Sequence, residues 1–286
     1  MKQLTVISGK GGTGKTTITA AFAHLAGNAV LADCDVDAPD LHMILHPEIR
    51  KTIPFSGLKI AVKDDDKCTD CGLCREHCRF DAVSKDFQII RESCEGCGVC
   101  EFVCPTDAIK MVDRSCGRAF MSTTRFGPMS HAELFTAEEA SGKLVTLVRN
   151  NARILADENG RDLVIIDGPP GIGCPVIASI AGADLVLVVT EPTLSGIHDL
   201  ERVLGVAAHF GVPAVVCINK YDINLDNTER IVGYCKDVGS EVVGRLGYDD
   251  TATTAMIAGK TVTEVDESVL SREIGELWTA VKKALE

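Results

Sequence analysis

The sequence predicts an α/β domain, in which helices flank a parallel P-loop sheet, interrupted by a small α+β insert. Three observations carry this prediction: a glycine-rich loop follows the first apolar run, apolar runs alternate with helix-length stretches after Ser141, and eight of the 13 cysteines fall between Cys68 and Cys104. The α/β domain is therefore expected to be discontinuous, with parts 1–56 and 116–286 on either side of an insert over 57–115.

The elements of the α/β domain follow one another as a parallel sheet requires. An apolar run over 3–8 leads into glycines and a helix that begins near Thr16, and a second run covers 29–32. Short, continuous apolar runs are typical of parallel strands that are covered on both faces. The later runs lie at residues 163–166, 185–189, 214–218 and 242–245, and helix-length stretches lie at 196–210 and 226–239. We expect residues 271–286 to form a final helix on this sheet, since their polar face is not basic enough for a membrane helix.

The composition limits the partners. The formal net charge is −12, from 41 acidic and 29 basic residues, with no basic stripe. Because phosphate backbones are bound by clustered Lys and Arg, nucleic acid is not expected as a partner. No apolar run reaches the ~18–20 residues that span a bilayer, and the N-terminus lacks the pattern of a signal peptide. We therefore expect a cytoplasmic protein without membrane association, in which an odd number of cysteines points to metal rather than to disulfides.

A phosphate-binding loop lies between the first strand and the first helix. Residues 9–16 read GKGGTGKT and fit the pattern G-x-x-x-x-G-K-[ST]. Glycines let successive N–H groups point at phosphate oxygens, and the helix N-terminus adds its positive end. Lys15 is expected to contact the β- and γ-phosphates, and the Thr16 hydroxyl to bind Mg²⁺. The predicted nucleotide-binding residues of this segment are Gly9, Lys10, Gly11, Gly12, Thr13, Gly14, Lys15, Thr16 and Thr17.

Polar residues at the ends of other apolar runs complete the predicted nucleotide site. Asp167 ends such a run and precedes Gly-Pro-Pro-Gly, so it is expected to hold Mg²⁺ ahead of a loop that can move. Asp33, Asp35 and Asp37 follow the second run, and one or two of them are expected only to cap a helix or face solvent. Asn219 begins the string Asn-Lys-Tyr-Asp, which formally matches the guanine-reading N-K-x-D of GTPases.

The insert contains a repeat in which residues 68–83 align without gaps on residues 94–109. Each half has the pattern C-x2-C-x2-C-x3-C of bacterial two-cluster ferredoxins, whose fourth cysteine binds the other cluster. The expected ligands are Cys68, Cys71, Cys74 and Cys104 for one 4Fe–4S cluster, and Cys94, Cys97, Cys100 and Cys78 for the second. Zinc is the alternative, but two overlapping runs of this kind are hard to divide into four-ligand zinc sites. Arg79 stands where such ferredoxins usually have proline, which affects the local turn and not the ligation.

The string KGGTGKTT resembles the deviant Walker A loop, K-G-G-x-G-K-[ST], of the MinD/ParA/Mrp/nitrogenase-iron-protein superfamily of ATPases. The chain as a whole resembles the members of that superfamily that carry an inserted ferredoxin domain. The resemblance implies that Lys10 reaches across a face-to-face dimer to the partner's nucleotide, and that Asp35, of the three aspartates, orients the attacking water. It also implies that Asn219 faces adenine, so that ATP is favoured over GTP. Lys10, Lys15 and Asp35 are therefore the expected catalytic residues.

Three functions stay open. In the first, the nucleotide state of an ATPase is coupled to electron transfer through two 4Fe–4S clusters. In the second, the protein is an accessory ATPase in the assembly or delivery of iron–sulfur or other metal cofactors. In the third, it is a MinD/ParA-like switch whose clusters are structural or sense redox state. The first is favoured because a delivered cluster should be held labilely.

The cofactors that the sequence predicts are ATP, Mg²⁺ and two 4Fe–4S clusters. The expected partners are a second copy or a paralogue, in a nucleotide-dependent homodimer or heterodimer, and a redox or metallocofactor-assembly protein. Cys116 and Cys174 leave open a third metal site between subunits.

Overall fold

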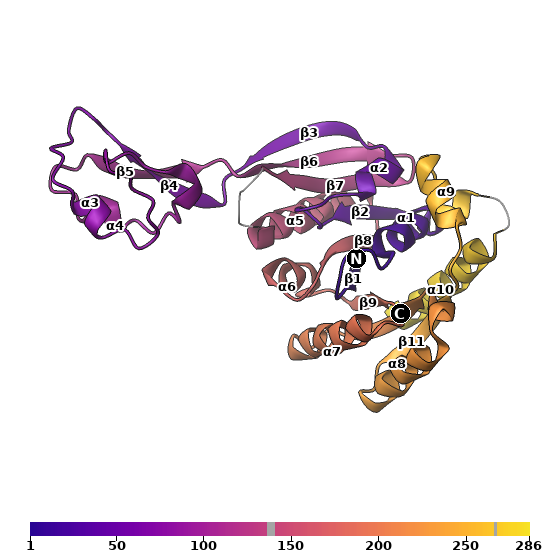
Figure 1. Ribbon diagram of the computed structural model, residues 1–286. Coiled ribbons are helices and arrows are strands. Elements are labelled where there is room, and N and C mark those ends of the chain that lie inside the picture. The colour runs from indigo at the N-terminus through magenta and orange to yellow at the C-terminus, as the bar shows by residue number, and fades with distance from the viewer. Residues whose placement is uncertain (136–140, 266–267) are drawn as a thin grey trace. The chain divides into compact units, whose positions relative to one another are not determined.

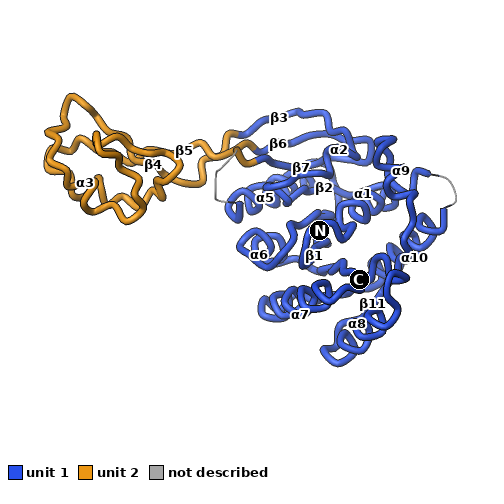
Figure 2. Tube along the Cα trace, in the orientation of Figure 1, with its two compact units in different colours: residues 1–53, 119–133, 141–286 blue, residues 54–118, 134–140 orange. Residues whose placement is uncertain are grey.

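The computed structural model describes residues 1–135, 141–265 and 268–286, and the chain divides into two compact units (Figures 1 and 2). Unit 1 comprises Met1–Ile53, Ala119–Glu133 and Ser141–Glu286. Unit 2 comprises Pro54–Arg118 and Leu134–Ala140, where 136–140 lie outside the described residues. Its first segment exceeds the predicted insert of 57–115 by a few residues at each end. The chain enters unit 2 at the end of one strand and returns at the start of another.

Unit 1 is built on a nine-stranded sheet with the strand order β11-β10-β9-β1-β8-β2-β7-β6-β3. Its strands are β1 (Lys2–Ser8), β2 (Ala29–Asp33), β3 (Glu48–Phe55), β6 (Gly117–Thr124), β7 (Gly127–Leu134), β8 (Leu163–Pro170), β9 (Leu185–Thr190), β10 (Ala214–Asn219) and β11 (Glu241–Leu246). Its helices are α1 (Lys15–Ala26), α2 (Leu41–Leu45), α5 (Ser141–Asn159), α6 (Cys174–Ile180), α7 (Leu194–His209), α8 (Leu225–Asp237), α9 (Thr251–Ile257) and α10 (Val269–Leu285), with short 3-10 turns at Tyr221–Ile223 and Val262–Glu264.

The predicted sheet is confirmed as mostly parallel. β1 pairs in parallel with β8 and β9, and the pairs β2–β8, β2–β7, β9–β10 and β10–β11 are parallel too. β6 and β7 are neighbours joined by only two residues, which makes them an antiparallel hairpin. The sequence pattern did not predict β3, β6 or β7. β3 is an exposed edge strand with charged side chains, and such strands show no continuous apolar run.

Helices cover both faces of the sheet, which explains why its strands read as continuous apolar runs. Along β9, Leu185, Leu187 and Val189 belong to the core that α1 and α10 cover, while Val186 and Val188 belong to the core under α6, α7 and α8. The expected final helix is confirmed as α10, whose apolar face is buried in the first of these cores. Among the described residues, no helix is long and apolar enough to cross a bilayer.

Unit 2 is small and has an internal duplication. Strands β4 (Leu58–Lys63) and β5 (Ile109–Arg114) form an antiparallel pair, and two single-turn helices, α3 (Leu73–Glu76) and α4 (Val99–Phe102), lie at equivalent places of the sequence repeat, with a 3-10 turn at Arg91–Ser93. The residues with left-handed backbone recur at the same spacing, as the pairs Asp70 and Gly96, Gly72 and Gly98, and Asp81 and Asp107. The two sequence repeats therefore have the same local fold.

Candidate functional site

The polar residues of unit 1 gather at one edge of its sheet. Ser8, Asp33 and Asn219 end β1, β2 and β10, Asp167 lies near the end of β8, and Glu191 directly follows β9. These five strands are parallel neighbours, so their carboxyl ends meet. That edge is where open α/β sheets bind ligands.

The loop after β1 has a conformation that requires glycine. Gly12 and Gly14 have left-handed backbones, with φ of 79° and 90°. A side chain at Gly9 would collide with Asp199 of α7, and one at Gly14 would collide with the amide of Asn219. Helix α1 begins directly after Gly14 with no side-chain cap, so the N–H groups of its first turn lack a side-chain acceptor. This geometry leaves the helix N-terminus available to an anion.

Lys15 lies among carboxylates at the start of α1. Its side chain is 10% exposed, and its Nζ is 2.8 Å from Asp35 Oδ2. Burial alone would lower the pKa of Lys15, but Asp167, Asp35 and Asp33 outweigh burial and hold the pKa above its ordinary value. Lys15 is therefore a buried cation whose charge is balanced by carboxylates.

Asp167 is fully buried and only half satisfied. Its Oδ1 accepts a hydrogen bond from the Thr19 hydroxyl at 3.1 Å, whereas its Oδ2 has no hydrogen-bond partner. Burial raises the pKa of Asp167, although Lys15 acts in the opposite direction. A buried, unpartnered carboxylate oxygen beside the Thr16–Thr19 turn fits a divalent cation, because buried polar atoms are nearly always satisfied by a partner or an ion.

The three aspartates after β2 have different surroundings. Asp33 is buried and accepts hydrogen bonds from the backbone N–H groups of Asp35, at 3.1 Å, and Leu41, at 3.2 Å. Burial raises its pKa well above the ordinary value. Asp37 is exposed, and Asp35 pairs with Lys15. Asp33 therefore holds the loop in shape, and Asp35 is the aspartate that contacts the phosphate-binding loop.

Two cavities lie on either side of that loop, and Gly12, Gly14 and Thr17 line both. The larger, of about 590 Å³, is also lined by Lys15, Thr16, Asp35, Asp37, Pro169 and Pro170. The smaller, of about 310 Å³, is also lined by Asn219, Leu246, Gly247, Tyr248, Asp249 and Ile274.

The smaller cavity is lined by the predicted Asn219 and by Tyr248, which the sequence pattern did not predict. Asn219 donates from Nδ2 to the Thr13 carbonyl at 2.8 Å, which ties β10 to the loop. Asp222 accepts a hydrogen bond from the backbone N–H of Tyr248 at 2.9 Å. Tyr248 follows β11, so the rule that identified Asn219, a polar residue after a strand, could also have identified the segment after β11.

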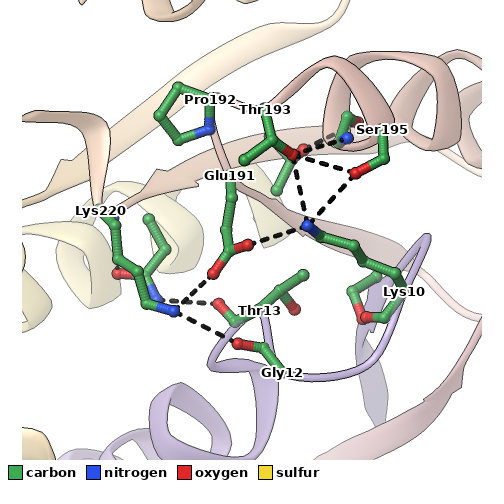
Figure 3. A network of polar contacts seen from close by, with 12 residues as sticks. Lys10, Gly12, Thr13, Glu191, Pro192, Thr193, Ser195 and Lys220 are labelled. Atoms are coloured by element: carbon green, nitrogen blue, oxygen red, sulfur yellow. Dashed lines mark hydrogen bonds and ion pairs between the residues drawn. The ribbon is translucent and has the colours of Figure 1, made fainter. Parts of the chain in front are cut away.

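Lys10 takes part in a separate polar network (Figure 3). Its Nζ lies 3.1 Å from Glu191 Oε2, 3.3 Å from the Thr193 hydroxyl and 3.5 Å from the Ser195 hydroxyl. Glu191 Oε1 pairs with Lys220 at 2.5 Å. Burial alone would raise the pKa of Glu191, but the hydrogen bonds from Lys220 and Lys10 outweigh it and hold the pKa below its ordinary value. The sequence pattern gave no signal for Glu191 beyond its place directly after a strand.

Unit 2 has two hollows that are lined by cysteines. One is lined by Cys68, Cys71, Cys74 and Cys104, and the other by Cys78, Cys94, Cys97 and Cys100. Each hollow thus takes three cysteines from one repeat and the last cysteine of the other. The backbone N–H of Ala82 donates to Cys78 Sγ at 3.4 Å, and that of Ala108 donates to Cys104 Sγ at 3.2 Å. These two bonds occupy equivalent places in the repeats.

None of the 13 cysteines forms a disulfide. Among the described residues, no group of three or more His, Cys, Asp or Glu side chains converges closely enough to hold a single metal ion. Cys34, Cys116, Cys217 and Cys235 are buried outside the hollows, and Cys174 is exposed at the start of α6.

The fold and the loop define a P-loop nucleotide-binding domain, and the comparisons give its family. Residues 4–262 match the CobQ/CobB/MinD/ParA nucleotide binding domain, so the chain belongs to this family of P-loop ATPases. It is similar to the uncharacterized protein MJ0578 of Methanocaldococcus jannaschii, with 38% identity over 225 residues that cover 78% of this chain and 79% of that protein. It is also similar to the septum site-determining protein MinD of Bacillus subtilis, with 25% identity over 209 residues that cover 71% of this chain and 58% of that protein.

Solved structures agree at the level of the fold. The cell division ATPase MinD of Pyrococcus furiosus has a TM-score of 0.60 at 17% identity, covering 99% of this chain and 98% of that one. A Pyrococcus horikoshii MinD complexed with Mg-ADP has the same TM-score and identity, covering 99% of this chain and 96% of that one.

Proposed function

We propose that this ATPase couples its nucleotide state to electron transfer through two 4Fe–4S clusters held by unit 2. The observation that carries the proposal is the pair of hollows, each lined by three cysteines of one repeat and the fourth cysteine of the other. This crossed set is the ligand set of two-cluster ferredoxins. Bound clusters would supply one-electron oxidation and reduction.

The residues of unit 2 fit such clusters better than they fit zinc. Zinc takes four ligands on one ion, whereas three cysteines of one C-x2-C-x2-C-x3-C run together with the last cysteine of the other are the pattern of two-cluster ferredoxins. The backbone N–H groups of Ala82 and Ala108 donate to cysteine sulfurs, as the environment of a cluster requires.

The chemistry of unit 1 follows from the charges around Lys15. The β- and γ-phosphates of ATP would replace Asp35 as the partner of Lys15, which frees the Asp35 carboxylate to orient the attacking water. Thr16 and Asp167 would hold Mg²⁺, since Asp167 Oδ2 lacks a partner. Lys10 would contact the nucleotide of a second copy, or of a paralogue, in a nucleotide-dependent dimer.

Adenine is the base that the smaller cavity is proposed to take. A guanine-reading N-K-x-D motif needs its aspartate at the base, but Asp222 does not line the smaller cavity, and its Oδ1 accepts the backbone N–H of Tyr248. Asn219 remains at the cavity wall to face the base.

The test is the metal content of anaerobically purified protein. We expect about eight irons and eight sulfides per chain, and an absorption that bleaches on reduction. Cys78→Ser should remove the cluster of the second hollow and Cys104→Ser that of the first, while Cys235→Ser, a buried thiol of unit 1, should remove neither. Stoichiometric zinc without labile sulfide would refute the proposal.

The similarity to MinD supports a second candidate, in which ATP drives a MinD/ParA-like switch and the clusters are structural or sense redox state. A redox titration separates the first candidate from a switch whose clusters are structural. Under the first, a non-hydrolysed ATP analogue with Mg²⁺ shifts the cluster potentials, whereas with structural clusters reduction and nucleotide binding are independent. A redox-sensing switch would share the shift but would pass no electrons to an acceptor protein. Transfer of iron and sulfide to an apo-protein acceptor would instead favour a role in cofactor assembly.

A further inference from the structure

We infer that Glu191 is a positioning residue that holds Lys10 away from the phosphate site until a second subunit competes for the lysine. The inference rests on the proposed function, in which Lys10 acts on the nucleotide of the partner subunit. Lys10 belongs to the phosphate-binding loop, yet it lines neither of the two cavities beside that loop. Its ammonium group instead lies at the start of α7, beside Glu191 (Figure 3).

The ammonium group of Lys10 lies at the N-terminus of α7, which is unfavourable for a cation, and the carboxylate of Glu191 offsets this. Thr193 is the N-cap of α7, a helix of 16 residues, and Ser195 lies in its first turn. The N-terminus of a helix carries the positive end of the helix dipole, which repels an ammonium group. The Thr193 hydroxyl already accepts the N–H of Gly196, so the two hydroxyls offer Lys10 only weak bonds of 3.3 and 3.5 Å. The carboxylate of Glu191 is therefore the group that keeps Lys10 there.

Glu191 can release Lys10 without becoming an unpaired charge. Its side chain is 11% exposed, and its other oxygen pairs with Lys220, which also donates to the Gly12 carbonyl at 3.5 Å. A buried carboxylate that lost its last partner would be strongly disfavoured. Here Lys220 remains when Lys10 leaves. Two lysines share one carboxylate, so each also repels the other. Their side chains are equally exposed, at 31% and 30%, but Lys220 has the shorter contact with Glu191, 2.5 Å against 3.1 Å, so Lys10 is the one that can leave.

The release of Lys10 should therefore set the nucleotide concentration at which the dimer forms. A dimer would exchange the Glu191–Lys10 pair for a contact between Lys10 and the phosphates of the partner subunit. Removing the carboxylate charge removes the competing partner, and formation of the dimer becomes easier. If Lys10 acted only within its own chain, removing the carboxylate charge of Glu191 would leave formation of the dimer unaffected.

The experiment compares four full-length chains: the wild type, Glu191→Gln, Lys10→Ala and the double variant. Light scattering gives the concentration of a non-hydrolysed ATP analogue at which half of each protein is dimeric. For Glu191→Gln we expect about a fivefold lower concentration, which corresponds to about 1 kcal/mol. The double variant should behave like Lys10→Ala, because the effect of Glu191 passes through Lys10. Ser195→Ala, which removes only the weakest of the contacts, should shift the concentration much less.

The outcomes separate the inference from the proposed function. If the wild type forms no nucleotide-dependent dimer, or if Lys10→Ala dimerises equally well, the proposed action of Lys10 across the dimer fails, and the inference fails with it. If Lys10→Ala abolishes the dimer but Glu191→Gln matches the wild type, the inference alone is overturned. ADP binding by the monomer provides the remaining readout. A gain of ADP affinity in Glu191→Gln that accounts for its dimer curve would also overturn the inference, because Glu191 would then act through Lys220 and the loop.

Discussion

Replacing Asp35 by Asn should strengthen nucleotide binding while it slows hydrolysis. Asp35 occupies the Lys15 ammonium group at 2.8 Å, and phosphate oxygens must take its place. The carboxylate also lies in the cavity that would receive the phosphates, so it repels them. The substitution removes this competitor and this repulsion, but it also removes the carboxylate that is proposed to orient water.

The size of the effect follows from the burial of the pair. Both side chains are about a tenth exposed, so the pair is a buried, charged hydrogen bond. Such bonds contribute roughly 1.5–3 kcal/mol. Asn can still accept a neutral hydrogen bond from Lys15, which would retain about half of that. We therefore expect a gain of about 1 kcal/mol, or about fivefold in affinity for Mg-ADP and Mg-ATP.

Isothermal titration with Mg-ADP and single-turnover hydrolysis of ATP are the two assays. Asp37→Asn is the matched control, because Asp37 lines the same cavity but is exposed and is not paired with Lys15. We expect it to change neither measurement by more than about twofold. If Asp35→Asn binds ADP more weakly than the wild type, the Asp35–Lys15 pair does not compete with phosphate and the reasoning is wrong.

Three further outcomes follow from single contacts. Lys15→Ala should weaken Mg-ATP binding at least ~100-fold in titration calorimetry, because it leaves buried carboxylates without their cation. Between pH 7 and pH 4 the protein should lose about 2–3 kcal/mol of unfolding free energy, because burial, with a smaller effect of His42, lowers the pKa of His131 to about 4. The stability is present above the unfolded pKa of about 6.5 and is lost as the pH falls toward about 4, so urea titrations of His131→Gln should show a flatter pH dependence. ATP should displace a labelled nucleotide at least about tenfold more effectively than GTP, since Asp222 does not line the smaller cavity and its Oδ1 accepts the N–H of Tyr248; equal displacement would show that Asp222 reads guanine.

The sequence predicted those parts of the fold that have a strong local signal. β1, β2 and β8 to β10 are buried on both faces, so each is a continuous apolar run, while the half-buried edge strand β11 has a shorter one. β3, β6 and β7 extend the sheet beyond β2 and were not predicted. The edge strand β3 carries charged side chains, and in β6 and β7 buried polar residues such as Ser122 and Ser130 interrupt the apolar pattern.

The candidate nucleotide site could be predicted only as far as its motifs are local. The loop 9–16 is continuous in sequence, so a single motif predicts all of its residues as phosphate-binding. Which of Asp33 and Asp35 contacts Lys15 depends on the path of the chain after β2, and this path is fixed by the backbone bonds that Asp33 accepts. Glu191 belongs to no motif, and only the alignment of β9 beside β1 brings it to Lys10.

The hydrophobic cores of unit 1 and unit 2 are separate, so removing metal should unfold unit 2 and leave nucleotide binding by unit 1 intact. The hydrophobic cluster of unit 2 is small: its buried members are Ala61, Cys74, Val83 and Ile109, and further cysteines pack around them. A unit of this size rarely folds on its own core, so bound clusters would supply much of its stability. The two large cores of unit 1 contain no residue of unit 2.

Protein stripped of iron under anaerobic conditions should therefore become sensitive to protease within 54–118, while its affinity for Mg-ADP stays within about threefold of that of the iron-containing protein. A protease-resistant unit 2 without iron would show that its thiols do not need metal. A loss of ADP affinity beyond about tenfold would show that the fold of unit 1 depends on unit 2, although the cores of the two units share no residue.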